Sequence, residues 1–226
     1  MMNIQFDSDI RPAAPGFKVL LMEADVTNGP TSDALWDEIQ AEARAICESI
    51  PMDRIRHRPA IDATRQAYKR CGKDPNRYRP SSEALCRRAV KGLELYRTLA
   101  VIDLINLLSM VTGHSIGGFD ADRVVGNTLT LGVGHAGEPY EGIGRGELNI
   151  EGLPVYRDAI GGIGTPTSDN ERTKLSEATR RLVMTINIYG DDPDHDTTQV
   201  EAIARRLLTD YAGATSIESQ LISMEP

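Results

Sequence analysis

One stretch of the chain combines arginine and tyrosine in a way that suits the binding of a polyanion. Residues 54–97 contain 13 lysines and arginines against four acidic residues, a local charge of +9. Arginine outnumbers lysine there by ten to three, and Tyr68, Tyr78 and Tyr96 lie among the basic residues. Guanidinium groups pair with phosphates, and aromatic rings stack on bases. The stretch therefore predicts an RNA-binding surface, for which the alternative is a solvated helix face whose charges pair with acids elsewhere.

A glycine-rich motif and an acidic segment each match a known binding pattern only in part. Residues 132–137 have the G-x-G-x-x-G spacing, but the residues that follow, EPYEGIGRGE, cannot open the helix that dinucleotide binding needs. Residues 192–196 space three carboxylates as a calcium loop does, yet Thr197 stands where glycine is required and Ile203 where glutamate is required. We therefore predict no dinucleotide site, and at 192–196 a solvated acidic turn before a helix.

The histidines and cysteines show no spacing that indicates a metal site or a catalytic nucleophile. The four histidines are far apart in the sequence, the three cysteines lack C-x-x-C spacing, and no G-x-S-x-G motif is present. We predict no metal, no cofactor and no disulfide framework. The thiols are expected to be reduced and mostly packed inside the protein.

The composition is that of a globular protein with an uneven charge distribution. The 226 residues are 40% hydrophobic and 26% charged, which excludes a disordered or fibrous chain. The net charge is −8, but outside residues 54–97 the chain has 12 basic and 29 acidic residues, a balance of −17. The overall sign therefore does not exclude a nucleic-acid partner. The start of the chain has no signal-peptide pattern and no segment is apolar enough to cross a membrane, so we expect a cytoplasmic protein with no membrane partner.

Helices dominate the first half of the predicted fold. Residues 17–26 are prone to form a strand, and apolar residues at helical spacing predict a helix over 35–50 that ends before Pro51. A second helix is expected to begin near Pro59 and to end at Gly72. The next two helices are expected to start with a serine cap at Ser81 or Ser82, and to cover residues 98–112, which are nearly all apolar.

The residues after Gly113 favour strands until the last helix. The segments TLTLGV, ELNIE, PVYRD and LVMTINIY are separated by glycine-rich turns. Thr198 and Glu201 have the spacing of a capping box, which predicts that the last helix begins there. The expected fold class is α+β.

The sequence resembles a known family over about residues 50–215. Four ordered blocks carry the resemblance: RPSSEAL at 79–85 with RRAVKG at 87–92, VIDLIN at 101–106 and GGFD at 117–120. They are similar to the B3/B4 domain of the phenylalanyl-tRNA synthetase β subunit, and more closely to the stand-alone B3/B4 proteins of bacteria. The resemblance implies an α+β fold with β-sheet layers and helices around a central pocket. It also implies a division into an N-terminal strand-and-helix extension at 1–50, packed on a B3/B4-like domain at 51–226.

The resemblance implies an activity and a set of pocket residues. In the synthetase this domain hydrolyses tyrosine mistakenly attached to the phenylalanine tRNA. Asn106 matches the pocket asparagine of the family, Gly117 stands where the synthetase has a histidine, and Gly118 follows it. Gly161 and Gly162 resemble the start of a glycine-rich wall, but the glutamate that follows this wall in the synthetase has no clear match. Catalytic residues are therefore left unassigned, and the alternative for Asn106 is a buried amide that ties the apolar helix to the sheet.

Three functions remain open at this point. The first is a trans-acting hydrolase of mischarged aminoacyl-tRNA. The second is a non-catalytic module that binds tRNA or another RNA, and the third is a protein that binds an amino acid or another small molecule in the same pocket. The residues expected to contact RNA are Arg79, Arg87, Arg88 and Lys91.

Overall fold

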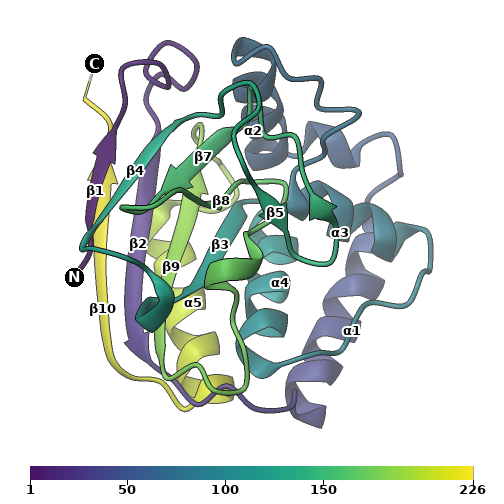
Figure 1. Ribbon diagram of the computed structural model, residues 1–226. Coiled ribbons are helices and arrows are strands. Elements are labelled where there is room, and N and C mark those ends of the chain that lie inside the picture. Colours follow the sequence, from purple (N-terminus) through teal and green to yellow (C-terminus); the bar gives the residue numbers. More distant parts are fainter. Residues whose placement is uncertain (226) are drawn as a thin grey trace.

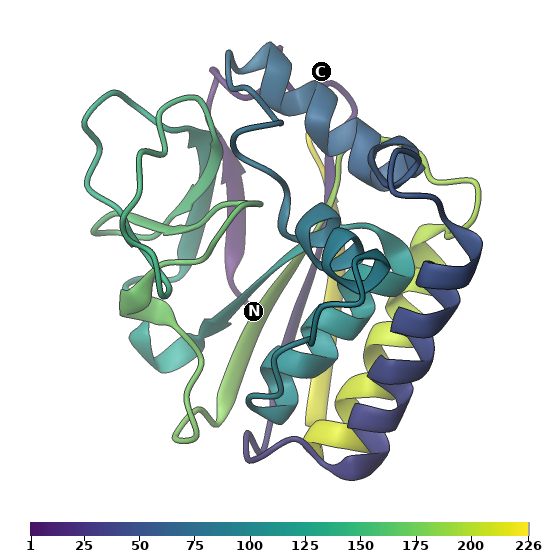
Figure 2. The same cartoon turned by 90° about the vertical axis from the view of Figure 1, so that its right-hand side faces the viewer.

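Two sheets and a layer of helices are stacked on one another in the computed structural model, which describes residues 1–225 (Figure 2). The first sheet has the order β1-β4-β7-β8 and the second the order β10-β2-β9-β3 (Figure 1). A hairpin of β5 and β6 stands apart. The strands are β1 (Asn3–Phe6), β2 (Lys18–Asp25), β3 (Ser115–Asp120), β4 (Thr128–Val133), β5 (Glu141–Gly142), β6 (Gly146–Glu147), β7 (Pro154–Arg157), β8 (Gly162–Gly164), β9 (Arg181–Ile188) and β10 (Thr215–Ser223).

The helices form one outer layer and cover one end of the molecule. α1, α4 and α5 lie against the face of the second sheet that points away from the first sheet (Figure 2). The helices are α1 (Asp33–Ser49), α2 (Pro59–Arg70), α3 (Ser81–Val90), α4 (Ala100–Thr112) and α5 (Thr197–Ala212). The α+β class and the sheet layers expected from the sequence are therefore confirmed.

The second sheet is buried on both faces because its strands carry apolar residues at every position. Along β2, Val19 and Leu21 belong to the apolar cluster between the two sheets, whereas Leu20 and Met22 belong to the cluster under the helices. Successive side chains of a strand point to opposite faces. β2 and β9 pair antiparallel over their full lengths, from Lys18 with Ile188 to Asp25 with Arg181. This sheet thus supports the helices that form one wall of the site described below.

The two sheets end on neighbouring strands at the same side of the molecule. β3 is the edge of the second sheet and β8 is the edge of the first. The loop that follows β8 reaches α3, because the Ser81 N–H donates to the Pro166 carbonyl at 2.7 Å. A space bounded by α3, α4, β3 and this loop results, and it is the central pocket that the fold expectation named.

Two predicted helix starts are wrong by one or two residues. Pro80, not a serine, is the N-cap residue of α3, and it supplies no side-chain hydrogen bond. The capping box of α5 is formed by Asp196 and Gln199, instead of Thr198 and Glu201. Asp196 supplies a carboxylate, a stronger acceptor than a hydroxyl, to the positive end of the helix.

Residues 1–50 contribute to all three layers. β1 pairs in parallel with β4, β2 lies between β10 and β9, and α1 packs against α3 and α4. The segment is therefore woven into both sheets, and the boundary at residue 50 stays a prediction from the sequence.

The glycine-rich motif at 132–137 has a structural explanation. A Cβ on Gly134 would lie 2.0 Å from the Ile150 carbonyl oxygen, so only glycine fits there. The residues after the motif form a turn and the short strand β5, as the sequence predicted, with no helix to receive a pyrophosphate. Within residues 1–225, no helix is long and apolar enough to cross a membrane.

Candidate functional site

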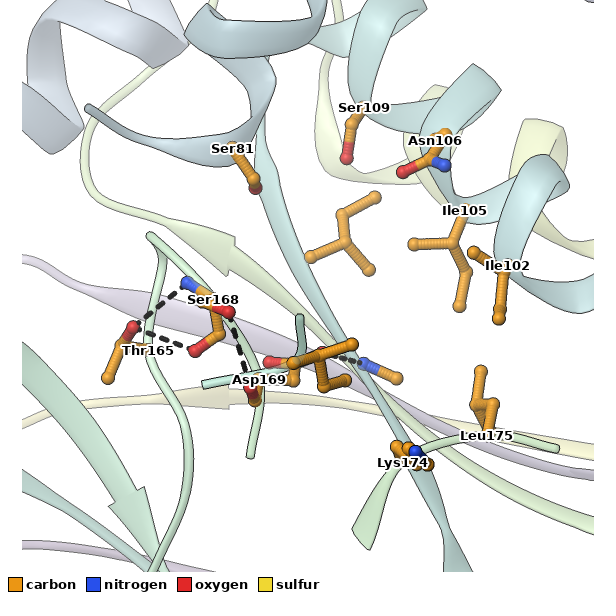
Figure 3. A pocket seen from close by; sticks show the side chains of 13 residues that line it. Ser81, Ile102, Ile105, Asn106, Ser109, Thr165, Ser168, Asp169, Lys174 and Leu175 are labelled. Carbon is orange, nitrogen blue, oxygen red and sulfur yellow. Dashed lines mark hydrogen bonds between the residues drawn. The ribbon is translucent and has the colours of Figure 1, made fainter. Parts of the chain in front are cut away.

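A cavity of about 200 Å³ lies where the edges of the two sheets meet the helices (Figure 3). Its walls combine apolar side chains with hydroxyl, amide and carboxyl groups, the composition expected of a small-molecule site. An apolar protein cavity of about 150 Å³ holds benzene, so this volume suits one amino-acid side chain. The lining residues are Ser81, Ile102, Ile105, Asn106, Ser109, Ile116, Gly118, Ile143, Thr165, Ser168, Asp169, Lys174 and Leu175.

One face of α4 supplies a wall of the cavity. Ile102, Ile105, Asn106 and Ser109 have the i, i+3, i+4, i+7 spacing of one helix face. The start of the helix is fixed by Asp103, whose carboxylate accepts hydrogen bonds from the backbone and side chain of Thr98 at 2.8 Å each.

Asn106 points into the cavity and is half-buried (Figure 3). Its side-chain amide forms no hydrogen bond with any residue in the described range 1–225. The alternative of a structural amide that ties the helix to the sheet therefore finds no partner. The amide is free to bind a ligand as both donor and acceptor.

β3 separates the two neighbouring glycines that the sequence analysis singled out. A Cβ on Gly118 would meet Ile105 Cδ1 at 2.6 Å, so this position faces the cavity. A Cβ on Gly117 would instead meet the Phe119 ring at 2.7 Å and Thr185 Oγ1 at 2.8 Å, on the other face of the strand. Gly117 consequently has no room for a histidine, and the cavity wall is formed by Gly118 alone of the pair.

The predicted glycine wall lies outside the cavity. Gly162 packs against the Tyr140 ring, where a Cβ would approach to 2.9 Å, and neither Gly161 nor Gly162 lines the space. The loop that follows forms the wall instead. Thr165 Oγ1 donates to the Ser168 carbonyl at 2.9 Å and accepts from the Ser168 N–H at 3.1 Å, which holds the loop in a tight turn. The Tyr140 hydroxyl donates to the same carbonyl at 2.7 Å.

Asp169 is the acidic residue of the cavity. Its Oδ2 accepts a hydrogen bond from the Gly118 N–H at 3.1 Å. Burial raises the pKa of this carboxyl to about 7, and the Gly118 hydrogen bond opposes the shift only in part. The residue keeps some access to solvent through the cavity, although the protein atoms around the carboxyl group remove most of its hydration. Both protonation states are therefore populated near neutral pH, as a general base or acid requires.

Six polar lining residues were missed by the sequence analysis: Ser81, Ser109, Thr165, Ser168, Asp169 and Lys174. Ser109 had a usable signal, because it follows Asn106 by three positions on a helix. Asp169 had none, since its place depends on the bridge that pairs it with Gly164.

Many arginines of the basic stretch point into the protein. Arg65 and Arg87 both pair with the fully buried Glu83, at 2.7 Å each. Arg58 donates to the carbonyls of Met110 at 2.6 Å and Val111 at 2.7 Å, at the end of α4. These side chains hold α2, α3 and α4 together.

The tyrosines of the same stretch differ in exposure. Tyr68 is fully buried and its hydroxyl bonds to Thr167 Oγ1 at 2.9 Å, so its predicted role as a stacking surface is wrong. Tyr96 is 68% exposed and lies under the Arg88 guanidinium, 4.3 Å from the ring centre.

The four residues expected to contact RNA are in different states. Arg79 and Lys91 are exposed and their side chains form no hydrogen bond or ion pair with residues 1–225. Arg87 is held by Glu83, and Arg88 Nε donates to the Glu94 carbonyl at 2.5 Å. Arg79 directly precedes the turn that brings Ser81 to the cavity, so it lies near the site.

Other side chains with catalytic chemistry lie away from the cavity or are suppressed. His114 is buried, and burial lowers the pKa of its imidazole to about 4. Cys71 and Cys86 are partly or fully buried, which raises their thiol pKa values, whereas Cys47 is exposed, so not every thiol is packed inside. Among residues 1–225, no group of three or more His, Cys, Asp and Glu side chains is placed to hold a metal ion.

Comparison with known proteins agrees with the resemblance seen in the sequence. The B3/4 domain family matches residues 63–202, more than half of the chain. No curated protein matches the chain.

Among solved structures, the chain is similar to an N-terminal fragment of the phenylalanyl-tRNA synthetase β subunit from Pyrococcus horikoshii, with 12% identity and a TM-score of 0.49. That match covers 99% of this chain and 54% of the other, so the chain spans about half of that fragment. The family match over 63–202 includes α3, α4, β3 and the loop of Asp169, and so every wall of the cavity. The chain belongs to the B3/4 domain family.

Proposed function

We propose that this protein hydrolyses the ester bond of mischarged aminoacyl-tRNA, acting as a free-standing domain in the cytoplasm. The observation that carries the proposal is the cavity itself. It offers apolar walls for one side chain, an unpartnered amide at Asn106 and a carboxyl group at Asp169 that can ionise near neutral pH.

Ester hydrolysis at this site needs an oriented water and no cofactor. In the proposed step, the Asp169 carboxylate accepts a proton from a water molecule as the water oxygen bonds to the ester carbonyl carbon. The bond from that carbon to the ribose oxygen then breaks, and the leaving oxygen receives the proton. The products are a free amino acid and a tRNA with a free terminal hydroxyl. Asn106 supports this role because its amide N–H can hydrogen-bond the carbonyl oxygen as negative charge develops on it.

The basic surface supports an RNA substrate less strongly than the sequence suggested. Arg79 and Lys91 are available to phosphates, but Arg65 and Arg87 are paired with Glu83. The same observation favours a second candidate, an amino-acid binding protein that uses the cavity without RNA. A non-catalytic RNA module would use Arg79 and Lys91 but has no need for the cavity.

A deacylation assay distinguishes these functions. Incubation with a panel of tRNAs, each carrying a wrong labelled amino acid, should show release from at least one member. Asp169→Asn should slow that release at least about 100-fold, since it removes the proposed base. The rate should also rise with pH through about 7, because only the ionised carboxyl accepts a proton.

Matched controls keep the assay specific. Asp37 and Asn3 are exposed and far from the cavity, so Asp37→Asn and Asn3→Ala should leave the rate unchanged. Unchanged release by Asp169→Asn, or no release from any tRNA, would contradict hydrolysis at this site.

A further inference from the structure

The first turn of α3 opens into the cavity with backbone donors that no side chain satisfies. Its N-cap residue, Pro80, has no side-chain acceptor, and the Ser81 N–H is used by Pro166. Within residues 1–225, the N–H groups of Ser82 and Glu83 have no hydrogen-bond acceptor. Such donors, together with the helix dipole, favour a negatively charged oxygen.

A buried hydroxyl group on another helix points to the same place. Ser109 on α4 is only 2% exposed, yet its Oγ forms no hydrogen bond with any of residues 1–225. Figure 3 shows this hydroxyl directed into the cavity beside Ser81, whose own hydroxyl also has no partner in that range. Buried hydroxyl groups are normally hydrogen-bonded, so two unpartnered ones next to an uncapped helix start indicate a missing acceptor.

The opposite side of the cavity has the reverse character. Asp169 presents an acceptor there, and Ile105, Ile116 and Leu175 lie among the lining residues as the apolar part of the wall. Lys174, the basic lining residue, is held by Glu171 at 2.5 Å. The cavity thus has one side made of donors and another that carries a carboxyl group, which suits a ligand with an anionic and a cationic end.

We propose that the start of α3, together with the hydroxyls of Ser81 and Ser109, is a subsite for a carboxylate group of an amino acid. This inference rests on the proposed function only in that the cavity takes an amino acid. The carboxylate has two sources: the α-carboxylate of a free amino acid, such as the product of hydrolysis, or the side chain of an acidic aminoacyl group. Asp169 would hold the ammonium group of the same ligand.

Titration of the full chain with small probes, followed by NMR or calorimetry up to about 10 mM, tests the subsite. Leucine carries only an α-carboxylate, the α-amide of glutamic acid carries only a side-chain carboxylate, and leucinamide carries neither. We expect one or both carboxylate probes to bind at least about tenfold more tightly than leucinamide, the ratio of a charge-assisted hydrogen bond. The probe that binds identifies the source of the carboxylate.

Variants connect the binding to the subsite. Ser81→Ala combined with Ser109→Ala should weaken the carboxylate probe about tenfold or more and leave leucinamide unaffected. Ser49→Ala, at the exposed end of α1, is the matched control and should change neither. Equal affinity for leucine and leucinamide, no binding of any carboxylate probe, or full affinity in the double variant would overturn the proposal.

The outcome is independent of the deacylation assay. Carboxylate binding without release from any tRNA would retain the subsite and reject the hydrolase. Release without carboxylate binding would retain the hydrolase and reject the subsite.

Discussion

The basic stretch at residues 54–97 and the cavity make opposite use of charge. In the basic stretch, the charges are dense in sequence, yet many of them hold helices together through buried pairs such as Arg65 with Glu83. In the cavity, the polar groups come from segments far apart in sequence, and several have no partner within residues 1–225, among them Asn106 and Ser109. Charge density along a chain therefore indicates where a protein is tied together as often as where it binds. Unpartnered polar groups around a space are the better sign of a ligand.

The largest expected effect is on the stability of the basic stretch. Glu83→Gln removes the charge that both Arg65 and Arg87 face in a buried place. Breaking such a pair costs about 3 to 5 kcal/mol, because an unpaired charge is left buried. Chemical denaturation should show this loss relative to wild type, with Asp37→Asn as the exposed control. A loss below about 1 kcal/mol would mean that these arginines are available to a ligand after all.

The next effect is on the cavity. In Gly118→Leu, the new side chain would point toward Ile105 Cδ1, the flexible end of a side chain, and would fill the space. We expect ligand binding or deacylation to fall by about 100-fold, because the substrate is displaced, while the unfolding midpoint changes little. Gly29→Ala is the control, since a Cβ there meets nothing within 4 Å. Full activity in Gly118→Leu would place the site elsewhere.

The third effect follows from the raised pKa of Asp169. In the unfolded chain this carboxyl has a pKa near 3.9, and folding raises it to about 7. The folded protein therefore binds more protons, and the stability that this group contributes below pH 4 is lost as the pH rises through about 7.

Asp169→Asn removes that loss. Between pH 4 and pH 8, the unfolding free energy of the variant should gain about 1 to 2 kcal/mol relative to wild type, less than the full shift because the carboxyl keeps some contact with solvent. Thermal or chemical unfolding at both pH values measures it. A difference that does not change with pH would show that the carboxyl titrates normally.

The smallest effect concerns the exposed cations. Replacing Arg79 and Lys91 with alanine should weaken RNA binding only several-fold at low salt and lower the salt dependence by about one or two ion releases. Because both side chains are exposed and have no partner within residues 1–225, the stability should be unchanged. Filter binding across a salt series checks this. A salt slope identical to wild type would remove these residues from any RNA surface.

The sequence predicted the fold where the signal was local and periodic. The apolar run of α4 and the blocks of the family resemblance identified the helix that carries Asn106, and the alternating segment LVMTINIY became β9. The starts of α3 and α5 were misplaced, because several residues with capping side chains stand close together and only the folded chain selects among them.

The site was predictable only in part. Asn106 and Gly118 were recognised from the family pattern, whereas Asp169 is brought to the cavity by its bridge to Gly164 and its bond to Gly118, which connect distant strands. The burial of Tyr68 and the pairing of Arg87 were also invisible, since a basic and aromatic composition does not say which side of a helix faces the core.

The central claim is that the cavity is the place where an aminoacyl group is bound and hydrolysed. The most direct measurement is the single-turnover rate of deacylation for the best substrate of the tRNA panel, compared between wild type, Asn106→Ala and the control Asn3→Ala. The account predicts that Asn106→Ala slows the step by at least about tenfold while Asn3→Ala matches wild type, because only Asn106 faces the carbonyl oxygen. Equal rates for all three proteins would contradict it.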